Sequence, residues 1–296
     1  MHIGIITVRD HEYHPNRRLL EAANKKGHRA TLIHPYRVWP CIEGGNPCLV
    51  GHLDIESIDV ALPRQGATVG DSCLALIRHF GLMGIPVAND LHAIRLTKNQ
   101  FFTLMALTAA GINVPNTVFV NSSQGFHDAL VRFGGFPVVV KQVSNRQGEG
   151  VLLIKTEDQA QKVVRDHLNE RSGVLLQRFI YPKGRRDIRV LVVGGKIAGA
   201  IELWPKEGDF RANVHLGGKY RPKELSPELE DLAFRAAKTV GLEIAGVDLI
   251  VDQDAQSYVI EVNYSPGFRG MEAATGIDIA DIIIDYLAAT YAKESV

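Results

Sequence analysis

Short apolar runs and amphipathic helical stretches alternate along the first part of the chain. Apolar runs that predict strands occur at residues 2–7, 30–34, 59–63 and 85–87. Helical periodicity predicts helices at 15–26 and 71–80, between those strands. This alternation is typical of a small parallel sheet covered by helices. Residues 35–57, which contain Trp39-Pro40 and Gly44-Gly45, are predicted to form a long loop.

The pattern changes after residue 88, where we place a domain boundary. A mostly helical segment is predicted at 89–110, and a lobe of mixed strands and helices follows. Its strands are predicted at 118–120, 137–141, 151–155 and 174–180, and its helices at 122–133 and 156–169. Because a loop containing glycine joins two of these strands, the sheet of this lobe is predicted to be antiparallel.

The last third of the chain is rich in strands. Gly194-Gly195 between apolar runs predicts a tight hairpin, because glycine adopts the positive φ angles of such a turn. A helix at 228–240, a second hairpin at 246–263 and a last helix at 279–291 complete the pattern. The predicted fold class is α/β with α+β lobes. Its expected parts are an N-terminal α/β domain at 1–88, a central lobe at 89–180 and a C-terminal lobe at 181–296.

The composition excludes several classes of function. The chain has 296 residues, enough for two or three domains, and a net charge of zero, so no global field favours nucleic acid or a membrane. No apolar run reaches the ~18–20 residues of a membrane-spanning helix, and the apolar run at residues 3–6 is too short for the apolar region of a signal peptide, so we expect none. We expect a cytoplasmic protein. Three cysteines without a Cys-x-x-Cys motif fit a reducing compartment; Cys41 and Cys48 could pair, but we expect thiols.

The second hairpin carries a candidate metal site. Symmetric pairing about Asp254 and Ala255 places Asp248 opposite Glu261, and Asn263 shares the face of Glu261 because side chains alternate along a strand. Two opposed carboxylates and an amide oxygen suit a hard divalent cation such as Mg²⁺, with substrate phosphates completing its shell. A hairpin with a solvated acidic face would give the same pattern, so spacing alone leaves both interpretations open.

Lysine and glycine form a candidate phosphate site in the central lobe. Lys141 ends an apolar run, and Gly148 and Gly150 follow in a polar loop where backbone N–H groups can approach a ligand. This is not a Walker A sequence, and a plain hairpin loop beside a surface lysine explains it equally well.

Arginines cluster in the C-terminal lobe. Arg189 shares one strand face with Asp187, and Arg211 precedes Asn213 by two residues. Arginine suits bidentate binding of phosphoryl or carboxylate oxygens, although surface ion pairing is the common alternative. We predict catalytic roles for Arg189, Arg211 and Asn213. We interpret His215 as a structural histidine.

The order of these features resembles the ATP-grasp enzymes, and within them the RimK-type ligases that add glutamate to a ribosomal protein. The resemblance runs from the first strand to the last helix. Its most specific segments are 206–213 (KEGDFRAN), 245–248 (AGVD), 261–267 (EVNYSPG), 275–280 (TGIDIA) and Pro63-Arg64.

The resemblance implies three lobes with ATP clamped between the second and third. It implies phosphate binding by Lys141, adenine recognition by a hinge and ribose binding by Asp187. The hinge residues are Gln177, Arg178, Phe179 and Ile180. It further implies that Arg211 and Asn213 face the γ-phosphate, and that Asp248, Glu261 and Asn263 bind Mg²⁺, with Mn²⁺ as an alternative ion. The implied reaction activates a carboxylate as an acyl phosphate, which an amine attacks to form an amide.

Two departures separate the chain from that family. Asn99-Gln100 stands where the family has Asp-Lys, with Lys98 beside it. Leu203-Trp204 follows Glu202 where glutamate ligases carry two arginines, so we expect a less acidic substrate than glutamate.

We therefore expect an ATP- and Mg²⁺-dependent carboxylate–amine ligase. Its expected partners are ATP, an amino acid and a carboxylate from a protein C-terminus or a small molecule, and we expect a homo-oligomer. The alternative is a nucleotide-binding regulatory or scaffold protein without turnover, for which Gln100 and Arg178 are the best support.

Overall fold

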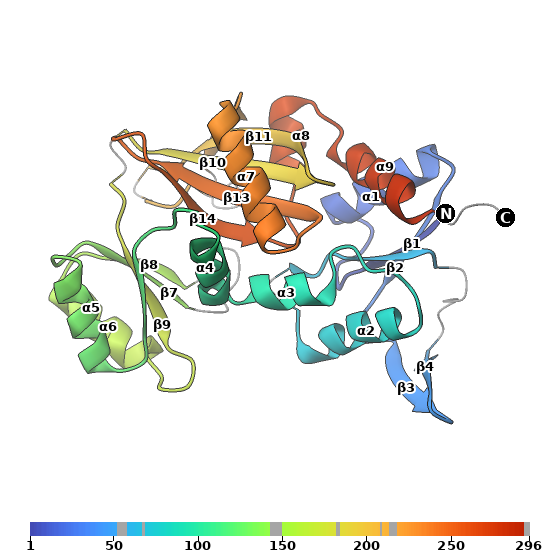
Figure 1. The fold of residues 1–296 in the computed structure, drawn as a ribbon, viewed down its shortest axis with the longest axis horizontal. Coiled ribbons are helices and arrows are strands. Elements are labelled where there is room, and N and C mark those ends of the chain that lie inside the picture. The colour runs from blue at the N-terminus through green and yellow to red at the C-terminus, as the bar shows by residue number, and fades with distance from the viewer. Residues whose placement is uncertain are drawn as a thin grey trace.

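A computed structural model describes residues 1–51, 58–66, 69–142, 150–181, 184–207, 209–212 and 218–292. Figure 1 shows the N-terminal sheet at one end of an elongated molecule, the C-terminal sheet in the middle and the central lobe at the other end. Among the described residues, no helix combines the length and apolar character that a membrane crossing would require.

The N-terminal unit is built on a parallel sheet of strand order β2-β1-β5. Its strands are β1 (His2–Ile6), β2 (Arg29–Ile33) and β5 (Val60–Pro63). Every residue of β1 and β5 is buried, as a parallel sheet covered on both faces requires. The helices α1 (His14–Lys25) and α2 (Asp71–Leu82) confirm the predicted alternation.

The central lobe has an antiparallel sheet of order β6-β9-β7-β8. Its strands are β6 (Thr117–Val120), β7 (Val138–Gln142), β8 (Val151–Ile154) and β9 (Val174–Arg178). The helices α5 (Ser123–Arg132) and α6 (Glu157–His167) pack together in its core, and Ser122 and Thr156 cap them by accepting backbone N–H bonds.

The C-terminal lobe has an antiparallel sheet of order β12-β11-β10-β13-β14. Its strands are β10 (Arg186–Val193), β11 (Lys196–Trp204), β12 (Lys219–Pro222), β13 (Ile244–Val251) and β14 (Ser257–Asn263). Its helices are α7 (Pro227–Thr239), α8 (Arg269–Thr275) and α9 (Ile279–Tyr291). The Gly194-Gly195 hairpin between β10 and β11 is confirmed, with positive φ at both glycines.

The N-terminal and C-terminal sheets share their hydrophobic cores, whereas the central lobe has a core of its own. Asn89 helps to join the N-terminal unit to the C-terminal lobe. Its amide nitrogen donates to the carbonyls of Ile244 (2.7 Å) and Tyr264 (2.9 Å). Its amide oxygen accepts the backbone N–H groups of Glu243 and Ile244. A buried asparagine with both ends bonded holds the C-terminal sheet firmly against residue 89.

Several predicted elements need correction. Residues 35–57 are not simply a loop, because β3 (Trp39–Glu43) and β4 (Asn46–Val50) form a hairpin within them. The helical segment 89–110 divides at Asn99 into α3 (Leu91–Lys98) and α4 (Gln100–Ala109). Asn99 causes the break, since its side chain accepts from two backbone N–H groups and caps the second helix. The strand predicted at 85–87 is only a bridge between Ala61 and Val87.

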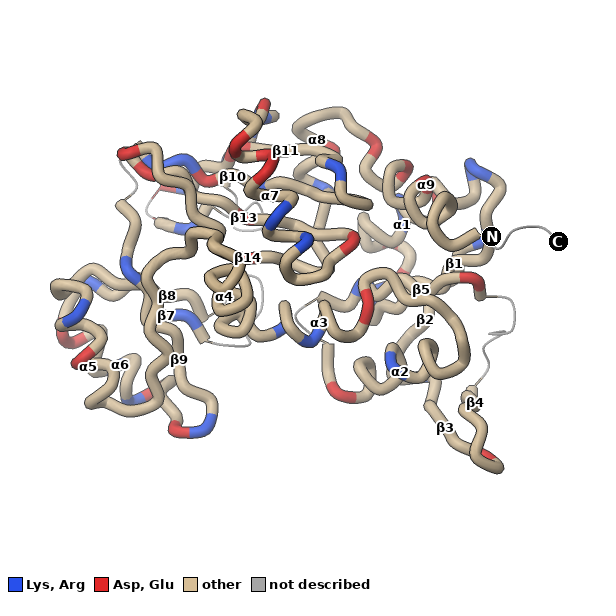
Figure 2. Tube along the Cα trace, in the orientation of Figure 1, with Lys and Arg blue, Asp and Glu red and all other residues tan. Residues whose placement is uncertain are grey.

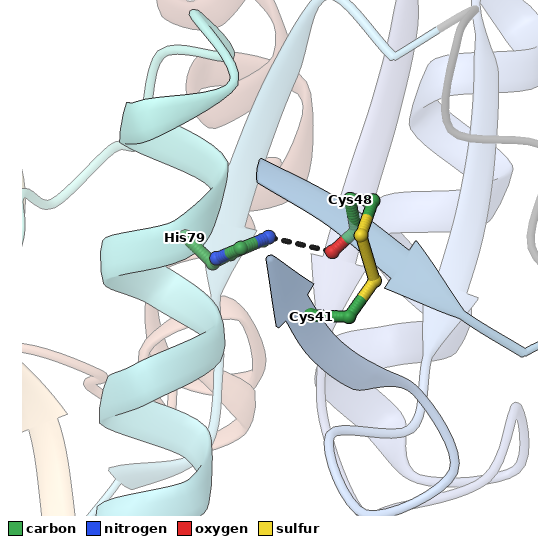
Figure 3. The surroundings of a disulfide bond; sticks show 3 residues. All are labelled: Cys41, Cys48 and His79. Carbon is green, nitrogen blue, oxygen red and sulfur yellow. Dashed lines mark hydrogen bonds between the residues drawn. A yellow bond between two sulfur atoms is a disulfide. The ribbon is translucent and has the colours of Figure 1, made fainter. Parts of the chain in front are cut away.

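The β3–β4 hairpin also overturns the expectation of free thiols at Cys41 and Cys48. These residues are direct cross-strand partners with Cα atoms 5.0 Å apart, and a disulfide joins them. In Figure 3, His79 of α2 lies beside this bond, with its Nε2 atom 2.6 Å from the carbonyl oxygen of Cys48. Cys73 remains a buried thiol, and burial raises its pKa to about 12.

Candidate active site

A cleft lies between the central and C-terminal lobes and brings most of the predicted site residues together. It encloses about 920 Å³ of space between protein atoms, counting its open mouth. Ten predicted residues line it: Lys141, Gln177, Arg178, Phe179, Ile180, Asp187, Arg189, Arg211, Asp248 and Glu261. The predicted positions Gly148 and Asn213, and also His215, lie outside the described residues.

Lys141 is the cation that the central lobe contributes. It lies near the end of β7, where it pairs with Val151 of β8 and Leu175 of β9, and only 7% of its surface is exposed. Burial lowers the pKa of the ammonium group, while the charges of Glu261 and Asp248 raise it. A buried lysine near two carboxylates of the facing lobe is therefore positioned for a ligand bound between them.

Asp248 and Glu261 face each other as the sequence predicted. They are paired residues of β13 and β14, and a bulge begins immediately after Asp248. Glu261 is accessible from the cleft, yet protein atoms surround it closely enough to raise its pKa by desolvation, and the charge of Asp248 raises it further. Asn263 pairs with Gly246 and shares the strand face of Glu261, although it does not line the cleft.

Arg189 binds Asp248 from the neighbouring strand. Its Nε atom donates to Asp248 Oδ1 at 2.7 Å and its Nη2 atom to Oδ2 at 2.6 Å. The charge of Asp248 is the main cause of a raised pKa for Arg189. The guanidinium thus fixes the direction in which this carboxylate faces Glu261.

Arg185, which the sequence places in a cluster with Arg186, Asp187 and Arg189 without assigning it a role, organises the ribose end of the cleft. Its Nη2 atom donates to Asp187 Oδ2 at 3.0 Å and to the carbonyl of Phe210 at 2.8 Å. Its Nη1 atom donates to the carbonyl of Ile180 at 2.9 Å. Burial raises the pKa of Asp187 to about 6, although Arg185 lowers it. One side chain therefore joins the hinge, the expected ribose carboxylate and the segment that carries Arg211.

Arg211 enters the cleft from the segment after β11. Asp209 holds it through bonds from Arg211 Nε to Oδ1 (3.1 Å) and from Nη2 to Oδ2 (2.9 Å). On the opposite lobe, Gly150 has φ of +81° and its carbonyl accepts the N–H of Gln142 at 3.2 Å. The glycine thus ends the polar loop where strand pairing begins again, and it does not line the cleft.

Apolar side chains complete the cleft, and except for Leu203 the sequence analysis did not assign them to it. They come from both lobes: Val139, Val151, Leu203, Phe210, Leu249, Ile250 and Ile260. Val139 could have been found, since alternation places it on the face of Lys141 two residues later. Phe210 could not, because its contact with Phe179, with ring centroids 6.3 Å apart, depends on how the lobes meet.

The two departures from the family occupy different surroundings. Gln100 donates to the carbonyl of Ile260 on β14 at 3.4 Å, next to Glu261. Leu203 lines the cleft, whereas Trp204 stacks outside it on Arg221, whose guanidinium carbon is 4.8 Å from the ring centroid. Arg221 also binds Glu202, with Nη2 2.8 Å from Oε2. Glu202 and Trp204 therefore lie on the strand face opposite Leu203.

Two antiparallel lobes that enclose a cleft with facing cationic and acidic side chains define an ATP-grasp protein. The RimK-like ATP-grasp domain model matches residues 97–287, and the RimK PreATP-grasp domain model matches residues 1–94. The chain belongs to the RimK-like ATP-grasp family.

Relatives and solved structures agree with this assignment. A probable alpha-L-glutamate ligase of Syntrophotalea carbinolica is 38% identical over 290 residues, 97% of this chain and 95% of the relative. A RimK domain protein from Sphaerobacter thermophilus superposes with a TM-score of 0.73 at 25% identity, covering 97% of this chain and 99% of that one. The ATP-grasp ligase PsnB, complexed with a precursor variant, Mg and ADP, has a TM-score of 0.72 at 23% identity and covers 98% of both chains. The chain is thus an ATP-dependent ligase that forms C–N bonds between carboxylates and amines.

The acidic pair is chemically suited to the Mg²⁺ that ATP-grasp ligases use with ATP. Desolvation and Asp248 both disfavour the ionised form of Glu261, and a bound cation would relieve that conflict. The described residues contain no group of three or more His, Cys, Asp or Glu side chains that could hold a metal ion. A cation here would therefore take two carboxylates, with an amide, phosphate or water supplying the remaining ligands.

Proposed function

We propose that this enzyme binds ATP with its phosphates between Lys141 and the acidic pair Asp248 and Glu261. The observation that supports this most directly is that Lys141 of the central lobe lines the same cleft as Asp248 and Glu261 of the C-terminal lobe, whose charges raise the pKa of the lysine. Asp248, Glu261 and Asn263 would hold Mg²⁺, with Mn²⁺ as the alternative ion. Lys141 would bind the phosphates together with backbone N–H groups of the loop containing Gly148 and Gly150.

The nucleotide base would lie at the hinge formed by residues 177–180. β9 ends at Arg178, so the hinge backbone beyond it is free of strand pairing. Phe179 packs against Tyr181 and Phe210 and forms an apolar wall for a flat ring. Asp187, held by Arg185, would accept hydrogen bonds from the ribose hydroxyls.

The reaction would proceed in two steps. An oxygen of the substrate carboxylate attacks the γ-phosphorus of ATP, the bond to the β-γ bridging oxygen breaks, and ADP leaves. The amine then attacks the carbonyl carbon of the acyl phosphate, and phosphate leaves as the amide forms and a proton is released. Arg211 and Asn213 would stabilise the transferring phosphoryl group, and Arg189 would keep Asp248 in position. Fixed positive charge supplies the catalysis that such a transfer requires.

The substrates would be an amino acid that supplies the amine and a carboxylate of a peptide, a protein C-terminus or a small molecule. The Syntrophotalea carbinolica relative is named for glutamate, and PsnB was complexed with a precursor. Leu203 lines the cleft where a glutamate ligase would place an arginine, so we propose an amino acid less acidic than glutamate.

Mass spectrometry combined with ADP release tests this function. The purified chain is incubated with ATP, Mg²⁺, a panel of amino acids and candidate carboxylates. We expect ADP and a product heavier than the carboxylate by one amino acid residue, and neither when ATP is omitted. Binding of ATP without ADP or product formation across the panel would instead support a nucleotide-binding scaffold.

We also propose a homo-oligomer that works in the cytoplasm. Phe102 and Met105 of α4 are 53% and 54% exposed, and burying them against a second copy would remove apolar surface from water. Light scattering after size exclusion tests the oligomer, and the double variant Phe102→Ser with Met105→Ser should dissociate it. Cell fractionation tests the location.

A further inference from the structure

Arg64 is a buried cation that the proposed ATP site does not use. It follows β5 directly, and its backbone N–H donates to the carbonyl of Ile6 at the end of β1. Only 7% of its surface is exposed. Its Nη2 atom donates to the carbonyl of Pro266 at 2.6 Å, whereas its buried Nε atom has no hydrogen-bond partner. Among the described residues, no carboxylate lies within ion-pair distance of it.

A buried guanidinium bonded to a neutral carbonyl is an unusual arrangement. Burial lowers the pKa of Arg64 to about 10, and the group remains charged at neutral pH. Desolvated charges in proteins are normally paired, because leaving one alone is costly. The guanidinium carbon also lies 5.7 Å from the centroid of the Phe268 ring, which offers only weak compensation. The missing partner is therefore an anion.

The Phe268 ring beside Arg64 also contacts a second side chain with an unpartnered polar atom, although that side chain, His14, has its Nε2 atom 3.4 Å from Glu272 Oε2. His14, at the start of α1, meets the same Phe268 ring, with centroids 5.9 Å apart, and its buried Nδ1 atom has no hydrogen-bond partner. Desolvation lowers the pKa of His14 and the charge of Glu272 raises it. The charges of Arg17, Arg18 and Arg269 lower it further. Two buried polar atoms without partners, on side chains that both contact the Phe268 ring, indicate a place where a polar ligand group is missing.

The location of Arg64 connects it to the reaction centre. Its acceptor Pro266 comes three residues after Asn263, and Pro266 packs so closely on Gly246 that a Cβ there would lie 2.8 Å from the proline Cβ. Gly246 is itself the strand partner of Asn263. In addition, Arg64 lies at the carboxyl ends of β1 and β5, which end at the paired residues Ile6 and Pro63, and the carboxyl ends of parallel strands are where open α/β sheets bind ligands.

We propose that Arg64 binds the α-carboxylate of the amino acid that supplies the amine, and so determines specificity for free amino acids. This inference rests on the proposed function. The carboxylate replaces the carbonyl of Pro266 as the partner of the guanidinium and also engages Nε–H. A charge-assisted bond is stronger than the neutral one that it replaces. The reacting carboxylate lies elsewhere, at the γ-phosphate beside Arg211.

Binding and kinetics with matched ligands test the proposal. The probes are L-glutamate, L-alanine and L-tryptophan, each as free acid and as α-amide, titrated calorimetrically into the full chain with Mg²⁺ and a non-hydrolysable ATP analogue. We expect at least one free acid to bind at least 10-fold more tightly than its amide. Arg64→Lys should weaken binding of that acid at least 10-fold and raise its KM in the ADP-release assay.

Controls separate this role from folding and from general charge. Arg64→Met should bind acid and amide alike, while its affinity for the ATP analogue stays within 2-fold of wild type. Arg17→Met removes the same charge from a more exposed site on α1 and should keep the preference for the acid. If Arg64→Met does not fold, the acid-to-amide ratio of the wild type and the Arg64→Lys variant decide the question.

Several outcomes would overturn the inference. They are equal binding of acids and amides by the wild type, wild-type preference in both Arg64 variants, no amino acid binding, or inorganic phosphate competing better than any amino acid. Failure of the proposed function gives a different result, namely amino acid binding that depends on Arg64 without any ADP release or amide product.

Discussion

Arg189 on β10 holds Asp248 on β13 in a bidentate ion pair, with donor–acceptor distances of 2.7 and 2.6 Å. Both carboxylate oxygens are engaged on the side facing Arg189, and each keeps a lone pair for another ligand. Asp248 also lies opposite Glu261, whose pKa it raises. The arginine is thus the counter-ion that allows two carboxylates to face each other. A bound metal ion would further reduce the repulsion between them.

Arg189→Met should therefore destabilise the protein most when Mg²⁺ is absent. Without the guanidinium, Asp248 and Glu261 repel each other, and we expect a loss of roughly 2–3 kcal/mol, below the value for a fully buried pair because both side chains are partly exposed. Urea unfolding in EDTA and in excess Mg²⁺ with ATP should show a smaller loss in the second condition. An equal loss in both would mean that no metal binds beside Asp248.

Glu261→Gln should abolish ATP turnover while leaving the fold intact. The amide preserves shape but removes a charge from the proposed metal site, and we expect ADP release to fall at least ~100-fold. Thermal unfolding should stay near that of the wild type, because glutamine avoids the desolvation that disfavours the carboxylate. Wild-type turnover in this variant would remove Glu261 from the metal site. Glu157→Gln, on α6 of the central lobe, is the matched control.

Lys141→Met should weaken nucleotide binding. The substitution keeps the length of the side chain and removes its charge, and a charge-assisted contact in a closed cleft contributes ~1.5–3 kcal/mol, or roughly 10- to 150-fold in affinity. Calorimetry with an ATP analogue measures the change. Lys162→Met on the exposed face of α6 removes the same charge away from the cleft and should bind normally. Unchanged affinity in Lys141→Met would place this lysine outside the phosphate site.

The sequence specified the hairpin of the acidic pair because local rules decide it. Strand alternation and a turn near Ala255, which has φ of +59°, place Asp248 opposite Glu261 without knowledge of any other element. The register toward the turn still differs by one residue from a symmetric hairpin, because of the bulge after Asp248. The position of a single extra residue of this kind cannot be predicted from the pattern of apolar residues.

Contacts between distant segments could not be predicted in the same way. The sequence does not distinguish Arg185 from a surface arginine, because its role depends on hydrogen bonds to the hinge and to Phe210. The pairing of Cys41 with Cys48 required the β3–β4 hairpin, and Pro40 and Pro47 within these strands favoured a loop instead. The hydrogen bond from Arg64 to the carbonyl of Pro266 joins residues that are 202 positions apart in the chain, so no local pattern predicts it.

Asp187 should make the stability of the protein depend on pH. Its pKa is raised from 3.8 to about 6 by burial, so the unfolded chain loses this proton first as the pH rises. The stability contributed by the protonated form is therefore fully present below pH 3.8 and is lost by the time the pH exceeds about 6. Relative to Asp187→Asn, the wild type should lose roughly 2–3 kcal/mol of unfolding free energy between pH 4 and pH 7.

Urea unfolding of both proteins at several pH values checks this. Asp166→Asn, on the exposed face of α6, controls for removal of a charge, and its difference from the wild type should change less with pH. A difference between wild type and Asp187→Asn that stays constant from pH 4 to pH 7 would contradict the raised pKa.

The amino acid substrate should be less acidic than glutamate, and Leu203 provides the reason. Leu203 pairs with Asp187 across the strands and lines the cleft, so this wall presents a methyl surface next to an acidic residue. A side-chain carboxylate beside Leu203 would be buried next to Asp187 instead of a cation, at a cost of several kcal/mol. In a competition assay, neutral or aromatic amino acids should therefore be incorporated ahead of L-glutamate.

Substitution of the two adjacent positions isolates the cause. Leu203→Arg places a guanidinium inside the cleft and should increase the share of glutamate incorporated at least ~10-fold, the gain expected for one charge-assisted pair. Trp204→Arg adds the same charge one residue later, on the opposite strand face beside Arg221, and should leave the preference unchanged. A wild-type enzyme that clearly prefers glutamate would show that the prediction is wrong. A response to Trp204→Arg but not to Leu203→Arg would place the amino acid on the other face of β11.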